Sequence, residues 1–547
     1  MLNKRGLNFL LKYAGFLLIL LFFSCANRQL PMGGPRDRTP PKLLKATPLN
    51  NTRNFNAKVI TLDFDEFFKI NNPSQEITMT PTPAKTPEYK TRKKSLIIDL
   101  KDTLEKNTTY VINFGKAIAD VNEGNILKNF TYVFSTGIHI DSLSISGNVI
   151  NNETQEKQKD ATVMLFTLKQ DTALFGKKKP TIYTTTDSLG NFTLNNLHPD
   201  DYRIYALFEK TSNKIYDNDN ELIAFLKKDI HLTRDTSNIK LKLFKQENEK
   251  FKFVDRRFDL DGKMFFTFNR RLSKPSLKII YPSALDNQKI VNYSKTNDTA
   301  TLFMKNMDFD SIRVAFFDDG KALDSTSLRK GKKESFQRNL GFIFNINNDL
   351  KLKPTIPFTF KTNLPIETFD SNLISLKEDS TDVSNFTVER DTANLNLFTV
   401  KYRWKQNLNY TLTIEANAFT DIYGDKNKRA LKRFNLDKEQ NYSQLTLSVT
   451  LPDTGKSYIV ELLNDQKNVL RSTVIHENTS IVYKNFVTAK YRVRVIYDAN
   501  KNGKWDSGNV KRRRQPENTW VSEELISLRP NWEQQTNITV PPEPPTY

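Results

Sequence analysis

Apolar residues recur at every second position along most of this chain, and this period restricts it to β structure. One run is Ile60, Leu62 and Phe64, with Thr and Asp between them. The same period returns in Leu96, Ile98 and Leu100, in Tyr110, Ile112 and Phe114, and in Tyr132 and Phe134. Successive side chains of a strand point to opposite faces, so these runs predict half-buried strands. The sequence predicts an all-β chain of tandem β-sandwich domains.

The first 24 residues have the pattern of a secretory signal peptide. Lys4, Arg5 and Lys12 give a positively charged start, and residues 16–23 form an unbroken apolar run. A charged start, a short apolar segment and a small residue before the cut are typical of exported proteins. The apolar run is too short to span a bilayer, which takes about 20 residues. We therefore predict that residues 1–24 are a signal peptide.

The only cysteine of the chain follows this segment directly. Cys25 has no second cysteine with which to form an internal disulfide. Residues 22–25, Phe-Phe-Ser-Cys, resemble the relaxed lipobox of Bacteroidetes lipoproteins, although the strict form has Leu at its first position. The resemblance implies that Cys25 carries lipid and anchors the chain to the outer membrane, because several acyl chains anchor a protein stably.

Residues 25–38 then form a lipidated tether, because they lack apolar periodicity. Residues 26–29 also lack the acidic residues that resemble a Bacteroidetes surface-export signal. Their absence favours the periplasmic face of the outer membrane over the cell surface.

Residues 39–137 present an ordered series of landmarks. The segment opens with Thr-Pro-Pro, continues through the strand at residues 60–66 and the strand at 107–112, and closes with Asp120, Gly124 and the strand at 130–137. In this order the landmarks resemble a bacterial Ig-like domain of the S-layer type. The resemblance implies an Ig-like sandwich with an adhesive or spacer role and without catalytic residues.

Residues 143–245 show a second pattern. It consists of Ser-Gly-Asn-Val at 146–149, a strand at 163–166, a strand–turn–strand signal at 185–192 and the run Asp-Tyr-Arg-Ile-Tyr-Ala at 201–206. This series is similar to the carboxypeptidase regulatory-like, or transthyretin-like, sandwich. The resemblance implies a non-catalytic module.

Both patterns recur further along the chain. The spacing from Asn196 to Tyr202 returns between Asn485 and Tyr491, and the strand at 409–414 with its following Asp and Gly repeats the strand at 109–112. We predict an approximate duplication, with convergent strand chemistry as the alternative. The remaining domains are then a middle β domain at 248–345, a second Ig-like domain at 346–440, a second transthyretin-like domain at 441–535 and a Pro-rich tail at 536–547.

The sharpest local motif is a loop of nine residues that begins at Asp498. Its spacing resembles an EF-hand calcium loop, with a glycine at the sixth position for the sharp turn. Its candidate ligands are Asp498, Asn500, Asn502, the carbonyl of Lys504, and Asp506. Asn509 stands where a bidentate Glu is expected, which removes a strong ligand. An Asx-rich turn that binds nothing is the alternative.

Catalytic signatures are absent from the sequence. The four histidines, at 139, 198, 231 and 476, form no metal-binding pair, and Gly-x-Ser-x-Gly and phosphate-binding glycine loops do not occur. Cys25 is assigned to lipid, so no thiol nucleophile remains. We predict that the protein is not an enzyme and that calcium is its one candidate cofactor.

The net charge of +20 favours anionic partners such as an acidic glycan or lipopolysaccharide, with a charge that serves only solubility as the alternative. A nucleic-acid partner is excluded by the predicted export. We expect a scaffold lipoprotein that acts through protein–protein contacts, with an outer-membrane protein as its partner. The alternative is a glycan-binding surface lipoprotein, in which exposed tryptophans stack on sugars. The candidates are Trp404, Trp505, Trp520 and Trp532.

Overall fold

The computed structural model describes residues 37–83, 85–211, 213–218, 220–248, 250–331, 336–346, 349–392 and 394–545. The predicted signal peptide and Cys25 lie outside the described residues. The chain divides into two compact units, 1–141 and 142–547. The regular secondary structure of both is almost entirely β-strand, which confirms the predicted all-β fold. None of the described helices is long and apolar enough to cross a membrane.

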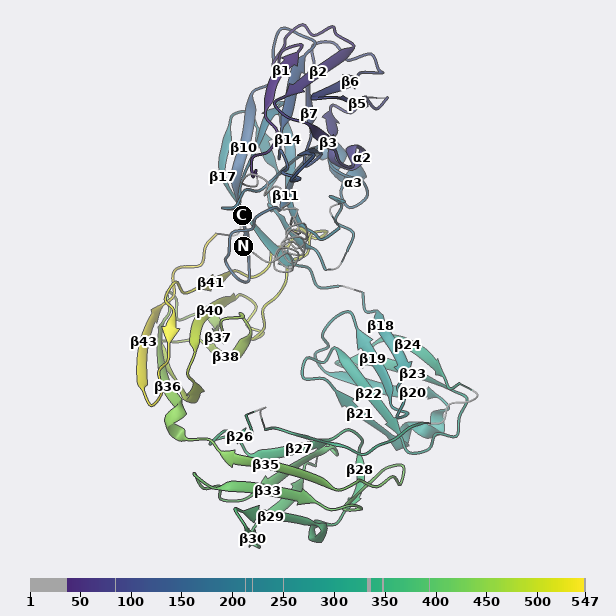
Figure 1. Ribbon diagram of the computed structural model, residues 1–547, viewed down its shortest axis with the longest axis vertical. Helices are drawn as coiled ribbons and strands as arrows, with labels where there is room; N and C mark the ends of the chain where they lie inside the picture. The colour runs from purple at the N-terminus through teal and green to yellow at the C-terminus, as the bar shows by residue number, and fades with distance from the viewer. Residues whose placement is uncertain are drawn as a thin grey trace, which may run out of the picture. The chain divides into compact units, whose positions relative to one another are not determined.

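The first unit is a sandwich whose core is formed by the alternating residues of the sequence (Figure 1, purple). Ile60, Leu62 and Phe64 on β2 are at most 1% exposed. One sheet has the order β1-β2-β6-β5, a second has the order β4-β7-β9, and β3 pairs with β8. The elements are β1 Leu43–Thr47, β2 Val59–Phe64, β3 Phe68–Ile70, α2 Pro73–Glu76, β4 Thr78–Thr80, β5 Glu88–Arg92, β6 Ser95–Asp99, β7 Thr109–Asn113, β8 Ile118–Asp120 and β9 Thr131–Ser135.

The second unit begins with the first region predicted as transthyretin-like. Its strands join in the order β12-β11-β14-β15-β17-β10-β13, and β16 also pairs with β14. The first strand, β10, runs parallel to the last, β17. The elements are β10 Leu143–Asn151, β11 Thr162–Thr167, α3 Leu168–Leu174, β12 Ile182–Thr185, β13 Asn191–Leu197, β14 Asp200–Phe208, β15 Leu222–Phe225, β16 Ile230–Leu232 and β17 Thr236–Lys245.

The middle region has two sheets, in the orders β18-β19-β22-β21 and β20-β23-β24. The rings of phenylalanines 251, 253, 266, 268 and 316 pack there in tilted and edge-to-face pairs. The elements are β18 Phe253–Phe258, β19 Met264–Phe268, β20 Pro275–Tyr281, η1 Ser283–Gln288, β21 Lys289–Tyr293, β22 Thr299–Met304, β23 Ser311–Asp318 and β24 Lys321–Arg329.

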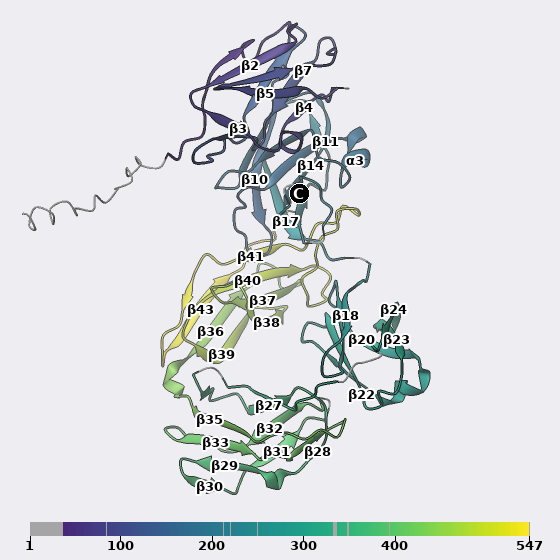
Figure 2. The same cartoon turned by 45° about the vertical axis from the view of Figure 1, so that its right-hand side comes forward.

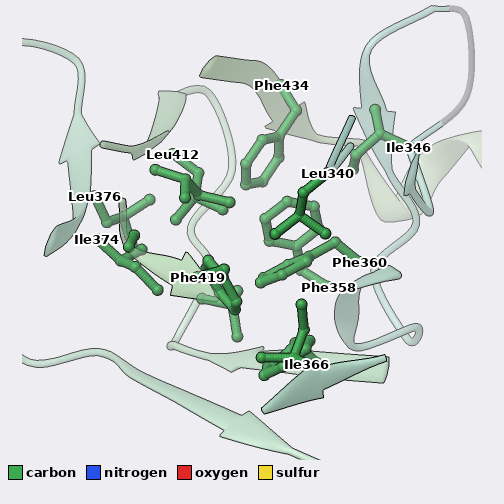
Figure 3. Close-up of a cluster of buried hydrophobic side chains, with 14 of the residues drawn as sticks. Leu340, Ile346, Phe358, Phe360, Ile366, Ile374, Leu376, Leu412, Phe419 and Phe434 are labelled. Atoms are coloured by element: carbon green, nitrogen blue, oxygen red, sulfur yellow. The ribbon is translucent and has the colours of Figure 1, made fainter. Parts of the chain in front are cut away.

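The region predicted as a second Ig-like domain repeats the strand pairing of the first unit. Its sheets have the orders β25-β27-β32-β31 and β26-β35-β33-β29-β30, and β28 pairs with β34. Its core contains Phe358, Phe360 and Phe419, which face one another in Figure 3. The elements are β25 Phe342–Phe344, β26 Lys351–Leu352, β27 Phe358–Thr362, β28 Ile366–Phe369, η2 Ser371–Leu373, β29 Ile374–Glu378, β30 Thr381–Val383, β31 Thr387–Arg390, β32 Leu397–Lys401, β33 Asn409–Ile414, β34 Phe419–Asp421 and β35 Ala430–Leu436.

The second region predicted as transthyretin-like has two sheets that enclose one core, and Figure 2 shows both of them. Their orders are β39-β36-β43 and β38-β37-β40-β41, and β42 also pairs with β40. As in the first region, the first strand runs parallel to the last. The elements are η3 Glu439–Asn441, β36 Tyr442–Thr450, β37 Ser457–Leu463, β38 Val469–Ile475, β39 Thr479–Val487, β40 Lys490–Asp498, β41 Thr519–Val521, β42 Ile526–Ser527 and β43 Glu533–Thr539.

The predicted end of this region at residue 535 cuts through β43. Thr536, Ile538 and Val540 continue the buried side of the strand, so the sandwich extends beyond the predicted start of the Pro-rich tail. Tail residues are also held by hydrogen bonds. The Tyr497 hydroxyl donates to the carbonyl of Pro541 at 2.9 Å, and the Asn518 amide donates to Glu543 at 3.0 Å.

Candidate functional site

The loop between β40 and β41, residues 499–518, is called here the docking loop, because it packs against the first transthyretin-like region. Val510 is 6% exposed and lies in a cluster with Phe225 and Phe244 of that region. Gly508 lies so close to Phe244 that an added Cβ would stand 2.6 Å from its ring. The glycine therefore permits the close approach of the two regions.

Polar groups reinforce this contact between segments more than 260 residues apart. The Val510 N–H donates to the Gln246 side chain at 2.8 Å, and the Gln515 side chain donates to the carbonyl of Phe225 at 2.6 Å. At the base of the loop, the Lys242 ammonium donates to Asn518 at 2.7 Å. Burial lowers the pKa of Lys242. These bonds satisfy groups that the contact removes from water.

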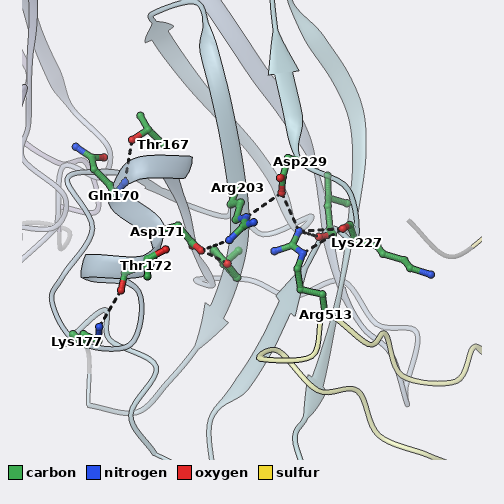
Figure 4. Close-up of polar contacts among 11 residues, drawn as sticks. Thr167, Gln170, Asp171, Thr172, Lys177, Arg203, Lys227, Asp229 and Arg513 are labelled. Atoms are coloured by element: carbon green, nitrogen blue, oxygen red, sulfur yellow. Dashed lines mark hydrogen bonds and ion pairs between the residues drawn. The ribbon is translucent and has the colours of Figure 1, made fainter.

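An ion-pair chain runs across the same face (Figure 4). Arg203 donates to Asp171 at 2.6 Å and to Asp229 at 3.0 Å, and Arg513 of the docking loop reaches Asp229 at 3.3 Å. Arg513 also donates to the carbonyl of Leu226 at 2.6 Å. Hydrogen bonds to Asp171 and Asp229 raise the pKa of Arg203. The two arginines are thus balanced by the two aspartates.

The predicted calcium ligands lie at the last residue of β40 and at the start of the docking loop, and hydrogen bonds join them. Asp498 is buried and accepts the N–H groups of Asn502 and Gly503 at 3.0 Å each. The Asn502 side chain accepts the Lys504 N–H at 2.8 Å and donates to Asp506 at 2.8 Å. Asn500 also donates to Asp506. These bonds close the loop as an Asx-type turn.

Glu517 also holds this loop in place, although no sequence motif indicates a role for it. Its carboxylate accepts the N–H groups of Ala499 at 2.9 Å and Asp506 at 3.1 Å. Burial, together with the nearby Asp506 and Asp498, raises the pKa of Glu517. The Asn509 side chain accepts the Arg512 N–H at 2.8 Å, and the Asn509 backbone forms a short bridge with Arg514. Counted from Asp498, Glu517 stands at position 20, beyond the 12 residues of an EF-hand loop, so the motif gave no signal for it.

Across the described parts of the chain, no group of three His, Cys, Asp or Glu side chains is arranged to hold a metal ion. Calcium at Asp498, Asn500, Asn502, Lys504 and Asp506 therefore stays a prediction that rests on the motif.

The repeated sequence landmarks occupy equivalent local structures. Tyr202 donates to the carbonyl of His198 at 2.9 Å, and Tyr491 donates to the carbonyl of Val487 at 2.5 Å. In the other repeated pair, Tyr110 accepts the Glu105 N–H at 2.8 Å and Tyr410 accepts the Lys405 N–H at 2.7 Å. The equivalent tyrosines thus reach four and five residues back along the chain.

The four tryptophans differ in exposure. Trp404 packs against Phe358, Trp505 donates to the carbonyl of Glu517 at 3.1 Å, and Trp520 packs against the core of its region. Trp532 is 56% exposed. It is therefore the tryptophan best placed to stack on a sugar.

The one family model that matches the chain covers part of the first unit. Residues 37–136 match the model of the bacterial Ig-like domain, which confirms the predicted domain type there. No curated protein sequence matches the chain.

Several solved structures are similar to parts of the chain at low identity. A major pilin subunit of Bacillus cereus is 9% identical, covers 73% of this chain and 99% of its own, and has a TM-score of 0.14. The S-layer protein rSbsC is 10% identical, with 84% and 65% covered and a TM-score of 0.14. The glucan-utilization protein SGBP-B of Bacteroides ovatus is 11% identical, with 62% and 87% covered and a TM-score of 0.17. No inference about function follows from likenesses at these TM-scores.

Proposed function

We propose that this protein is a lipid-anchored, non-enzymatic scaffold of the outer membrane that acts through protein–protein contacts. The observation that carries the proposal is the use of aspartates at its turns, of which Asp120 is buried and Asp187 is exposed. Asp120 accepts three backbone N–H groups, at 2.6 to 2.8 Å, and Asp187 accepts two at 2.8 Å. Asp498 closes the docking loop in the same way. Such aspartates stabilise turns between strands rather than converge on a substrate.

The edge strand β38 is the surface that we assign to the partner. β38 lies at the end of the order β38-β37-β40-β41, and Val469, Leu470 and Val474 on it are 37% to 45% exposed. An edge strand presents unpaired backbone groups that a strand of another protein can extend. The sandwich modules of the chain would then hold this edge at a fixed place.

A pull-down tests the scaffold proposal. The chain is tagged at its C-terminus, the envelope is solubilised in mild detergent, and co-purifying proteins are identified by mass spectrometry. We expect a stoichiometric outer-membrane protein that is lost from the variant L470K/V474K and kept by V482K/V487K, a matched double change at exposed valines of β39. Recovery of the chain alone would contradict the scaffold proposal.

A separate experiment tests the proposed lipid anchor at Cys25. Cys25→Ser removes the predicted lipid attachment, so we expect the chain to move from the membrane to the soluble fraction. An unchanged membrane fraction would contradict lipid anchoring at Cys25.

A glycan-binding surface lipoprotein is the second candidate function, and the exposed Trp532 favours it. Trp532→Ala should then abolish binding of the purified chain on a glycan array. Retained binding would contradict the assignment of Trp532.

A further inference from the structure

The tip of the docking loop carries four consecutive cations, residues 511–514. The N–H of Arg513 donates to the carbonyl of Val510 at 3.1 Å, and Asn509 and Arg514 pair across the turn. Val510 is buried on one side, whereas Lys511, Arg512 and Arg514 are exposed on the other. The apolar side of the turn therefore fixes the position in which its cations meet solvent.

A second basic turn lies against the first. Lys227 and Lys228, between β15 and β16, are both exposed. Arg513 donates to the carbonyl of Lys227 at 3.2 Å, so the two turns are in direct contact although 284 or more residues separate them. Figure 4 shows the Lys227 side chain extending away from the ion-pair chain.

The acidic groups at this place are already engaged. Asp229 lies within 3.3 Å of both Arg203 and Arg513, and Asp171 is held by Arg203. These two carboxylates balance the two arginines. Lys227, Lys228, Lys511 and Arg514 therefore leave an excess of positive charge around the junction, and we call these four residues the basic patch.

We propose that the basic patch binds an acidic polysaccharide through its carboxylate or sulfate groups. Like charges held close together repel one another, and a polyanion that releases its counterions on binding relieves that repulsion. The inference extends the second candidate function and does not depend on the scaffold proposal.

The composition of the patch favours a polysaccharide over other anionic partners. The cores of protein–protein interfaces are depleted in charged residues, and the two turns present charged side chains around a buried valine. A membrane surface is usually met by an amphipathic helix with an apolar face, whereas this patch consists of two tight turns. A flexible polyanion can bind such a surface through its charges alone.

Binding of the purified full chain to fluorescently labelled alginate and to dextran sulfate tests the proposal, with neutral dextran as the blank. The variants K511E/R514E and K227E/K228E each reverse two charges, one pair on each turn. We expect each to weaken binding roughly tenfold at about 50 mM salt. The matched control R92E/K93E reverses two exposed charges on the β5–β6 turn and should leave binding unchanged.

Melting temperatures of the variants establish whether the fold is retained. If K511E/R514E unfolds, K227E/K228E still tests the proposal. Equal weakening by R92E/K93E would show that net charge alone drives binding and would overturn the assignment. Absence of binding to both polyanions would overturn it too, as would binding only to phosphatidylglycerol-rich vesicles. The polysaccharide assay uses the purified chain without any partner protein. A negative result in this assay is therefore independent of a negative result in the pull-down.

Discussion

The loops that follow β14 and β40 start from equivalent strands, yet they cover different surfaces. In the first transthyretin-like region, the loop after β14 packs on its own region through Tyr216, which stacks near Phe175. In the second, residues 499–518 reach across and cover the same face of the first region with Val510. Glu221 and Glu517 hold backbone N–H groups near the end of each loop. The longer loop of the second region thus makes a contact with the first region through Val510.

A charge buried between the docking loop and the first transthyretin-like region should have the largest effect, because it would destabilise the contact that distinguishes the two loops. In Val510→Asp a carboxylate would replace the methyl groups beside Phe225 and Phe244. We expect a loss of about 3 kcal/mol or more in the stability of the contact. Hydrogen exchange should show faster exchange in residues 499–518 and in β15. Val482→Asp, at a valine 49% exposed, is the control, and equal exchange in both variants would contradict the docked position.

Removing Arg513 should have the next largest effect. Arg513→Ala deletes its bonds to the carbonyls of Leu226 and Lys227 and its ion pair with Asp229. Hydrogen bonds from charged groups contribute about 2 kcal/mol, so urea unfolding should shift by that order. Lys511→Ala, at an exposed neighbour, should leave the unfolding curve in place. An identical shift in both variants would show that Arg513 does not hold the loop.

Glu221 and Glu517 allow the two loops to be compared by the pH dependence of their stability. Burial raises the pKa of both Glu221 and Glu517 above 4.5. Each binds more protons in the folded chain, so its contribution to stability falls as the pH rises from 4.5 through its folded pKa. Glu517→Gln should flatten this dependence for exchange in the docking loop, and Glu221→Gln for residues 209–221.

Glu88→Gln serves as the control for these pH measurements. Its neighbours Lys90 and Lys101 lower the pKa of Glu88, so its contribution to stability is lost as the pH falls through its folded pKa. An unchanged pH profile in Glu517→Gln would show that this carboxyl titrates normally.

Calcium should have the smallest effect. The oxygens of Asp498 and Asn502 already accept N–H groups within the loop, so we expect millimolar calcium to leave the melting temperature unchanged. A rise of several degrees that Asp506→Asn abolishes would instead establish the calcium site. Loop 209–221, which lacks a glycine at the turn, provides the internal comparison.

Local patterns predicted the strands well because alternation records which face of a sheet is buried. Ile60, Leu62 and Phe64 are buried, and the spacing from Asn196 to Tyr202 reports a backbone turn that both regions share. The docking contact was not predictable in this way. Val510 and Phe244 lie 266 residues apart in sequence, and the period of a strand carries no information on such a partner. Glu517 was not predicted for the same reason, because its role depends on the end of a long loop lying against the start of that loop.

The parallel pairing of β10 with β17 has a mechanical consequence. The first region is entered at one end of this strand pair and left at the other, because the strands run in the same direction. A pull between residues 143 and 245 therefore loads the interstrand hydrogen bonds from Gly147 to Asn151 in shear, so they must fail together rather than one after another. Tension on the chain would be resisted by this ladder before any other part of the region extends.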